Sequence, residues 1–312
     1  MRREDILSKR TGIIASFVGL LCLLQLIPVR ADCHPGDAND YQKSIVVTGF
    51  PLLQPEQARW GALADMEVRL PQRIAAELNR RGKSFAFDAS HVELKSLGLI
   101  GQQYGDQFYR TGLSLEQLDL PDTQFLLTGT IENIGETADR DYAWHRRYLR
   151  RAAGLLNTRY NQARQFSLVL ELVDRYRGEL VWQQRFVRQG NWSRKRGEAT
   201  GTDSPVFWQT EYGKNVADAV AAAVTELQAT LDCQPLLLKV SQARGKEAVI
   251  PVFGTRQLHT GTEIQLLKQE NARPGLVAGN AQIEQVMANG VGIALKGDLL
   301  RDIRAGDFVR LD

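Results

Sequence analysis

A period-two alternation of large apolar residues between Phe166 and Trp192 constrains this chain more than any other feature of its sequence. Every second position from Phe166 to Leu172 is large and apolar, as in a strand with one buried face. After the polar segment 174–178 the alternation resumes with Leu180, Trp182 and Phe186. The pattern predicts a β-hairpin with a glycine-containing turn. Because two strands with one apolar face need further structure to cover them, the hairpin must belong to a larger sheet.

Two amphipathic segments are the expected cover for that sheet. The first carries apolar residues three or four positions apart and ends at Gly82: Leu63, Met66, Leu70, Ile74 and Leu78. Burying five such side chains contributes a gross ~8 to 15 kcal/mol, so this helix must face the sheet. The second opens at Ser204 and Pro205, which can cap a helix, and carries the stripe Val216, Val220, Val224, Leu227 and Leu231.

Three further strands complete the predicted main domain. They cover residues 44–50, 84–87 and 123–134, and Gly129 in the last marks a bulge or a close backbone approach. Residues 90–120 read as short helices and loops. The order strand, helix, strand, strand, hairpin, helix predicts an α/β (α+β) layout with a mixed sheet in a domain of residues 32–232.

The pattern changes at Cys233, after which short strands alternate with turns. We expect strands at 236–240, 248–253, 263–267, 281–286, 291–295 and 308–311. The phrases 258–266 and 303–311 resemble each other, each with an apolar residue, a glycine turn three positions later and then an alternating strand. About eighty residues with six strands predict a small all-β, SH3-like barrel domain over residues 233–312, a fold often used for docking.

Residues 1–31 have the features of a secretory signal peptide: basic residues, an apolar run from Ile13 to Ile27 and a cleavage site ending at Ala31. The run is shorter than the ~20 residues of a spanning helix, so no transmembrane anchor is expected after cleavage; an uncleaved anchor is the alternative. The signal holds five of the 39 Lys and Arg and two of the 36 Asp and Glu. The mature chain is therefore nearly neutral, and its charge gives no indication of nucleic-acid binding.

Two cysteines remain after cleavage, Cys33 near the new N-terminus and Cys233 at the expected domain boundary. In an oxidising compartment two cysteines usually pair, which predicts a Cys33–Cys233 disulfide. A bridge that closes so long a loop stabilises by roughly 5 kcal/mol in the chain-entropy model. The alternative is two separate buried thiols.

The segment from Arg140 to Arg196 is strongly basic, with fourteen Lys or Arg against four Asp or Glu. A basic face for an acidic partner is one interpretation, and two solvated arginine-rich loops are the other. Tryptophan and arginine are common interface anchors, which favours the first interpretation. The candidate interface residues are Trp144, Arg146, Arg147, Arg150, Arg151, Trp192, Arg194, Lys195 and Arg196.

The search for catalytic motifs finds no nucleophile elbow, no phosphate-binding glycine loop and no dinucleotide-binding fingerprint. The four histidines are dispersed, without the spacing of a helical metal site, and there is no C-x-x-C pair. We therefore expect no enzyme activity, no cofactor and no metal. An envelope hydrolase whose site is assembled only in space is the alternative that a motif search leaves open.

Five segments in this order resemble the flagellar assembly protein T (FlgT) family: 45–51 (IVVTGFP), 125–129 (FLLTG), 178–182 (GELVW), 207–213 (FWQTEYG) and 233–237 (CQPLL). The resemblance covers nearly all of the mature chain. It implies a middle domain similar to the N-terminal domain of TolB and a small β module after it. We expect only the middle and C-terminal domains of the family here, since about a dozen residues separate the cleavage site from the first strand and leave no room for the family's additional N-terminal domain.

The resemblance further implies a non-enzymatic periplasmic scaffold of the flagellar basal body, which forms or builds the H ring around the L and P rings. The implied partners are the L and P ring proteins, stator-associated ring proteins and further copies of the chain in a homo-oligomeric ring. A periplasmic binding accessory of a Tol-like or secretion complex is the alternative function. The expected absence of the N-terminal domain argues against a role in the stator-associated ring.

Overall fold

The structure is a computed structural model, and it describes residues 41–61, 63–94, 122–135, 162–193, 200–252, 258–287, 290–295 and 302–311. The predicted signal peptide lies outside these ranges. The part of residues 90–120 that follows Leu94 lies outside them as well. In the described residues, no helix has both the length and the apolar character that crossing a membrane requires. The fold is a mixed α+β arrangement built on two larger sheets, which we call the central sheet and the C-terminal sheet.

The central sheet has five strands in the order β3-β1-β4-β5-β6. Neighbours β3, β1 and β4 are parallel, whereas β4, β5 and β6 are antiparallel, so the prediction of a mixed sheet is confirmed. The strands are β1 (Lys43–Gly49), β3 (Ser84–Glu93), β4 (Phe125–Asn133), β5 (Gln162–Asp174) and β6 (Glu179–Trp192). The expected strand at residues 84–87 is thus longer than predicted.

The predicted hairpin is β5 and β6, which pair with Leu168 opposite Phe186 and Leu172 opposite Trp182. Gly178 closes the turn with a φ of 71°, a left-handed conformation that favours glycine. In β4, a Cβ atom on Gly129 would lie 2.8 Å from the carbonyl oxygen of Val169 on β5. The predicted close backbone approach at this glycine is therefore confirmed.

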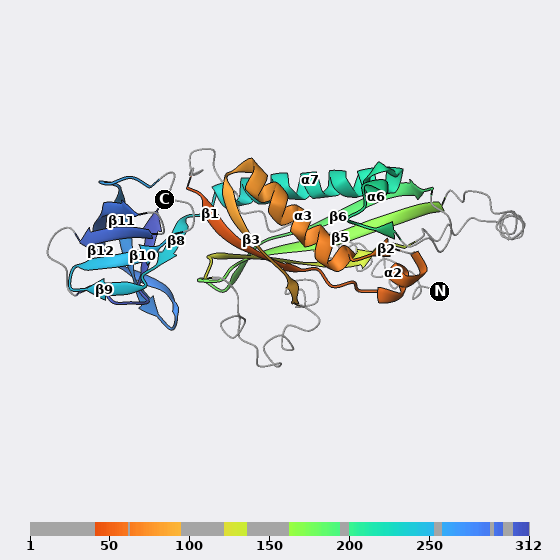
Figure 1. Cartoon of the computed structure of the whole chain (residues 1–312). Coiled ribbons are helices and arrows are strands. Elements are labelled where there is room, and N and C mark those ends of the chain that lie inside the picture. The colour runs from red at the N-terminus through yellow and green to blue at the C-terminus, as the bar shows by residue number, and fades with distance from the viewer. Residues whose placement is uncertain are drawn as a thin grey trace, which may run out of the picture. The chain divides into compact units, whose positions relative to one another are not determined.

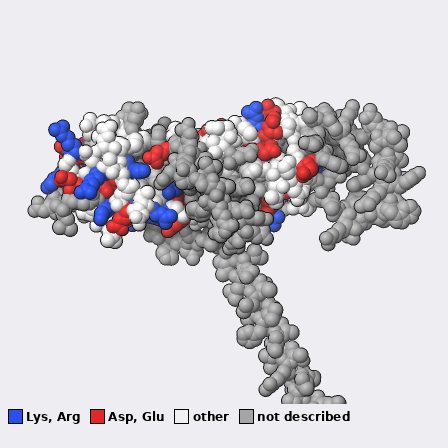
Figure 2. Space-filling model, turned by 90° about the horizontal axis from the view of Figure 1, so that it is seen from below, with Lys and Arg blue, Asp and Glu red and all other residues white. Residues whose placement is uncertain are grey.

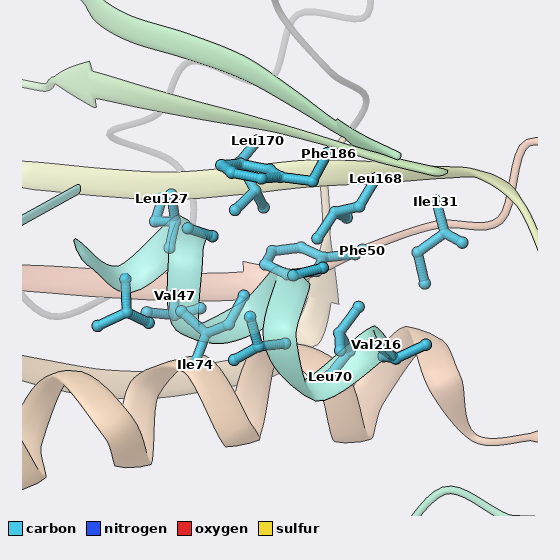
Figure 3. Close-up of a cluster of buried hydrophobic side chains, with 14 of the residues drawn as sticks. Val47, Phe50, Leu70, Ile74, Leu127, Ile131, Leu168, Leu170, Phe186 and Val216 are labelled. Atoms are coloured by element: carbon cyan, nitrogen blue, oxygen red, sulfur yellow. The ribbon is translucent and has the colours of Figure 1, made fainter. Parts of the chain in front are cut away.

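Helices α3 (Met66–Arg81) and α7 (Glu211–Asp232) lie on the same face of the central sheet (Figure 1). Both predicted apolar stripes are buried there, and Figure 3 shows Leu70, Ile74 and Val216 meeting side chains from the strands. Gly82 ends α3 in a left-handed conformation, as expected. The prediction that Leu63 belongs to this helix is wrong, because α3 begins only at Met66. Leu63 lies in β2 (Leu63–Ala64), and its helical spacing from Met66 is coincidental.

Shorter elements border this layer. Helix α6 (Pro205–Gln209) begins where predicted, with Ser204 Oγ accepting from the backbone N–H of Val206 at 3.3 Å. Thr210 then ends α6 and caps α7, so the predicted single helix is two helices with a corner between them. Helix α2 (Pro55–Gly61) and the two-stranded sheet of β2 with β7 (Thr200–Gly201) complete this part.

The C-terminal sheet has seven antiparallel strands in the order β8-β14-β11-β12-β13-β10-β9. It comprises β8 (Leu236–Lys239), β9 (Gln242–Arg244), β10 (Glu247–Pro251), β11 (Glu263–Glu270), β12 (Arg273–Met287), β13 (Gly290–Leu295) and β14 (Phe308–Leu311). Strands β8 and β9 stand at opposite ends of this order but only two residues separate them in the chain. The sheet must therefore curl, and it forms an antiparallel half-barrel around its own apolar cluster.

All six predicted C-terminal strands have counterparts, and β12 extends further toward the N-terminus than predicted. The two similar phrases hold equivalent turns, since Gly261 and Gly306 have φ values of 91° and 92°. The narrower descriptions of the two parts as TolB-N-like and SH3-like stay predictions, as does the division at residue 233.

Candidate functional site

Most of the predicted interface residues lie outside the described residues. These are Trp144, Arg146, Arg147, Arg150, Arg151, Arg194, Lys195 and Arg196. Their role as an interface therefore stays a prediction, and Trp192 is the member of the set that the structure places.

Trp192 is a core residue, and its prediction as an interface anchor is wrong. Its side chain is 2 % exposed and its ring centroid lies 6.1 Å from that of Phe207 and 6.0 Å from that of Tyr212. The guanidinium of Arg164 lies over the indole, 4.6 Å from its centroid. The end of β6 thus packs under α6 and α7, and the indole is not available to a partner.

Other arginines of the basic segment also make contacts within the chain. Arg185 Nε lies 2.6 Å from Glu132 Oε2 on β4, and Arg175 donates to the carbonyl oxygen of Thr123 at 3.3 Å. On the face shown in Figure 2, the basic and acidic side chains of the described residues are interspersed. Arginines in the described part of the basic segment are therefore paired or hydrogen-bonded within the chain.

The edges of the central sheet are partly blocked by side chains. On edge strand β3, the Asn79 amide pairs with both the N–H and the C=O of Ala86, each at 2.8 Å. On edge strand β6, Asn215 donates to the carbonyl oxygen of Gln189 at 2.5 Å and Arg188 to that of Val187 at 2.9 Å. Residues 181–185 of β6 carry no comparable cap from any described residue, and an open edge is a template for pairing with another chain.

A cluster of polar contacts surrounds the β5–β6 turn, residues 174–178. Asp174 is buried, and its Oδ1 accepts from the backbone N–H groups of Tyr176 and Arg177, both at 3.0 Å. Its carbonyl oxygen accepts from the N–H of Gly178 at 2.7 Å. One carboxylate thus organises the entire turn, a use of aspartate that is common in tight turns.

Gln124 connects this turn to the C-terminal sheet. Its Nε2 donates to Asp174 Oδ2 and to the carbonyl oxygen of Pro235, both at 3.1 Å. Its Oε1 accepts from the backbone N–H of Leu237 on β8 at 2.9 Å. Gln124 is 1 % exposed, and its hydrogen bonds to Asp174 and Leu237 are buried, whereas the one to Pro235 is partly buried.

Tyr176 supplies the apolar part of the same contact. Its ring lies 5.2 Å from that of Phe308, in a small cluster that Leu237 and Leu267 complete. Its hydroxyl donates to Asp122 Oδ1 at 3.1 Å. Burial and the charge of Asp122 raise the pKa of Tyr176, so the phenol stays protonated and acts as a hydrogen-bond donor rather than as a base.

Burial raises the pKa of Asp174 above the usual aspartate range, against the opposing effect of its hydrogen bonds. Between the usual and the raised value the folded chain binds more protons than the unfolded chain. We therefore expect the free energy of unfolding to fall as pH rises through this window, and to level off above it. Urea denaturation at a series of pH values from about 3.5 upward should show this slope.

The variant Asp174→Asn should remove that slope, because an amide does not titrate but keeps an acceptor for the turn. Asp203→Asn is the matched control, since Asp203 is exposed and lies 3.8 Å from Arg69 in a surface ion pair. If the pH dependence of the free energy of unfolding persists in Asp174→Asn, another titratable group causes it.

Cys33, the predicted disulfide partner of Cys233, lies outside the described residues. The pairing with Cys33 therefore stays a prediction. In the part of the chain that the structure describes, no group of three or more His, Cys, Asp or Glu could hold a metal ion. A small pocket beside Tyr176 is lined among others by Ser44, Asp122 and Lys239, without a nucleophile paired to a base.

Sequence reasoning did not single out Gln124, Asp174 or Tyr176. The sequence did indicate a turn here, because an aspartate and a glycine at the two ends of a short polar segment, Asp174 and Gly178, are typical of one. Gln124 carried none, since its partners are 50, 111 and 113 residues away.

In the comparison with protein families, the model of the flagellar assembly protein T middle domain matches residues 33–202, more than half of the chain. No curated protein matches the chain.

Among solved structures, the hypothetical protein CT253 from Chlamydia trachomatis is 12 % identical, with 61 % of this chain and 98 % of that chain covered and a TM-score of 0.38. Protein XCC0632 from Xanthomonas campestris is 9 % identical, with 66 % and 93 % covered and a TM-score of 0.33. Lipoprotein GNA1162 from Neisseria meningitidis is 12 % identical, with 60 % and 99 % covered and a TM-score of 0.28. Likeness at these scores carries no conclusion about function.

Proposed function

Because this chain belongs to the flagellar assembly protein T family, we propose that it is a non-enzymatic structural component of the flagellar basal body. The family membership, which rests on the match over residues 33–202, gives it a role in flagellar assembly and a location in the bacterial envelope. Within that role the chain acts in the periplasm and forms or builds the H ring around the L and P rings. Its partners there are the L and P ring proteins and further copies of itself.

The described surface supports a contact function. Residues 181–185 of β6, which no described residue caps, offer backbone groups to a neighbouring chain, and the side-chain caps at Ala86, Val187 and Gln189 reduce the number of other positions for such pairing. A ring component needs this kind of restricted, repeated contact, because an edge that is open throughout would also pair in wrong registers.

A gene deletion tests the proposal. We expect the deletion strain to spread in soft agar no further than a strain without flagella, and to lack the H ring in electron cryotomograms of its basal bodies. Expression of the full chain should restore both, whereas a chain without residues 1–31 should restore neither, because it would not be exported. Normal swimming with intact outer rings in the deletion strain would contradict the proposal. Copurification with Tol-like or secretion complexes instead of basal bodies would favour the alternative accessory role.

A further inference from the structure

The two larger sheets are joined by a very short covalent connection. Helix α7, which packs on the central sheet, ends at Asp232, and β8 of the C-terminal sheet begins at Leu236. Units joined only by such a link are expected to move and unfold separately unless a specific contact couples them. We propose that the β5–β6 turn is that coupling element, and that it makes the central and C-terminal sheets unfold as one cooperative unit.

The polar half of the contact depends on both sheets. The Gln124 amide is held from one side by Asp174 and from the other by the backbone of Pro235 and Leu237. Because Gln124 is buried, separating the sheets without unfolding either would break its hydrogen bonds to Pro235 and Leu237 and leave its amide oxygen without a donor until water reached it. Partial separation is therefore unfavourable.

The apolar half has the same property. Three members of the small cluster come from the C-terminal sheet, Leu237, Leu267 and Phe308, and the fourth is Tyr176 from the turn. The cluster is separate from the main apolar clusters of the two sheets. Arg273 of β12 also lies against the turn, since a Cβ on Gly178 would be 2.9 Å from its Nη2. The turn thus covers a second, smaller apolar cluster of the C-terminal sheet.

Hydrogen–deuterium exchange on the purified chain, kept without reductant, tests the coupling. In the wild type, slow amides of β4 and β8 should share one opening reaction, and calorimetry should show one unfolding transition. In the double variant Gln124→Ala, Tyr176→Ala, amides of β8, β11 and β14 should exchange about tenfold faster or more, while those of β1 and β4 keep their rates. Calorimetry of this variant should show two transitions.

Two further variants keep the test decisive. Tyr176→Phe keeps the ring and loses only the bond to Asp122, so it should retain a single transition. Gln57→Ala is the matched amide control, because Gln57 contacts Gln54 and the N–H of Ile134, not the turn. Two transitions in the wild type, or equal acceleration of both sheets in the double variant, would overturn the proposal. Neither result depends on the proposed flagellar role.

Discussion

Replacing Gly213 with alanine is expected to lower the free energy of unfolding by about 3 kcal/mol or more, because the new methyl group has no space. Gly213 stands in the first turn of α7, directly after the corner with α6. A Cβ at this position would lie 2.0 Å from the carbonyl oxygen of Phe207 and 2.7 Å from its carbonyl carbon. These are backbone atoms, so no side-chain rotation relieves the clash.

The corner itself would have to open. Thr210 Oγ1 donates to the carbonyl oxygen of Phe207 at 2.6 Å and accepts from the N–H of Gly213 at 2.9 Å. Moving the two helices apart breaks both hydrogen bonds and withdraws Phe207 from the core, where it is fully buried.

Urea denaturation followed by circular dichroism measures the effect. Gly292→Ala is the control, since a Cβ there would meet Gln285 at 3.7 Å, an ordinary contact distance. The control should change the free energy of unfolding by less than about 1 kcal/mol. If both variants lose the same free energy of unfolding, the effect comes from replacing any glycine and not from the clash at the corner.

The sequence predicted the elements around this corner but not the corner. Helical spacing located the stripe from Val216 to Leu231, and Ser204 and Pro205 marked the start of α6, because both signals are local. The approach of Gly213 to Phe207 depends on how two helices pack against one sheet. No local pattern encodes that distance, so Gly213 looked like an ordinary glycine.

The same division between local and distant information holds elsewhere. Strand positions in the C-terminal sheet followed from alternation and turn glycines, whereas the strand order that places β14 between β8 and β11 did not. The contacts of Gln124 and Tyr176 join residues far apart in the chain, so the candidate coupling site could not be predicted. The basic segment was conspicuous by composition, but composition does not show which arginines pair within the chain.

Trp192 shows how two kinds of sequence evidence can disagree. Its position has the same parity as Trp182 and Phe186, so the period-two pattern already placed it on the buried face of β6. Its neighbours in the basic segment suggested an interface instead. The structure supports the pattern, because alternation reports the geometry of the strand itself whereas local composition reports only what is nearby in sequence.

Trp192→Ala is therefore expected to lower the free energy of unfolding by about 3 to 5 kcal/mol, the usual cost of emptying a large aromatic site in a core. Phe207 and Tyr212 would lose their ring contacts with the indole, and the cation–π contact of Arg164 would go as well. Trp192→Phe should recover most of the loss. Trp208→Ala is the matched control: Trp208 is only half-buried and is covered by Arg73 at 3.8 Å, so its replacement should cost less. Urea denaturation of the isolated chain measures the effect, and an unchanged free energy of unfolding in Trp192→Ala would contradict the placement of this residue in the core.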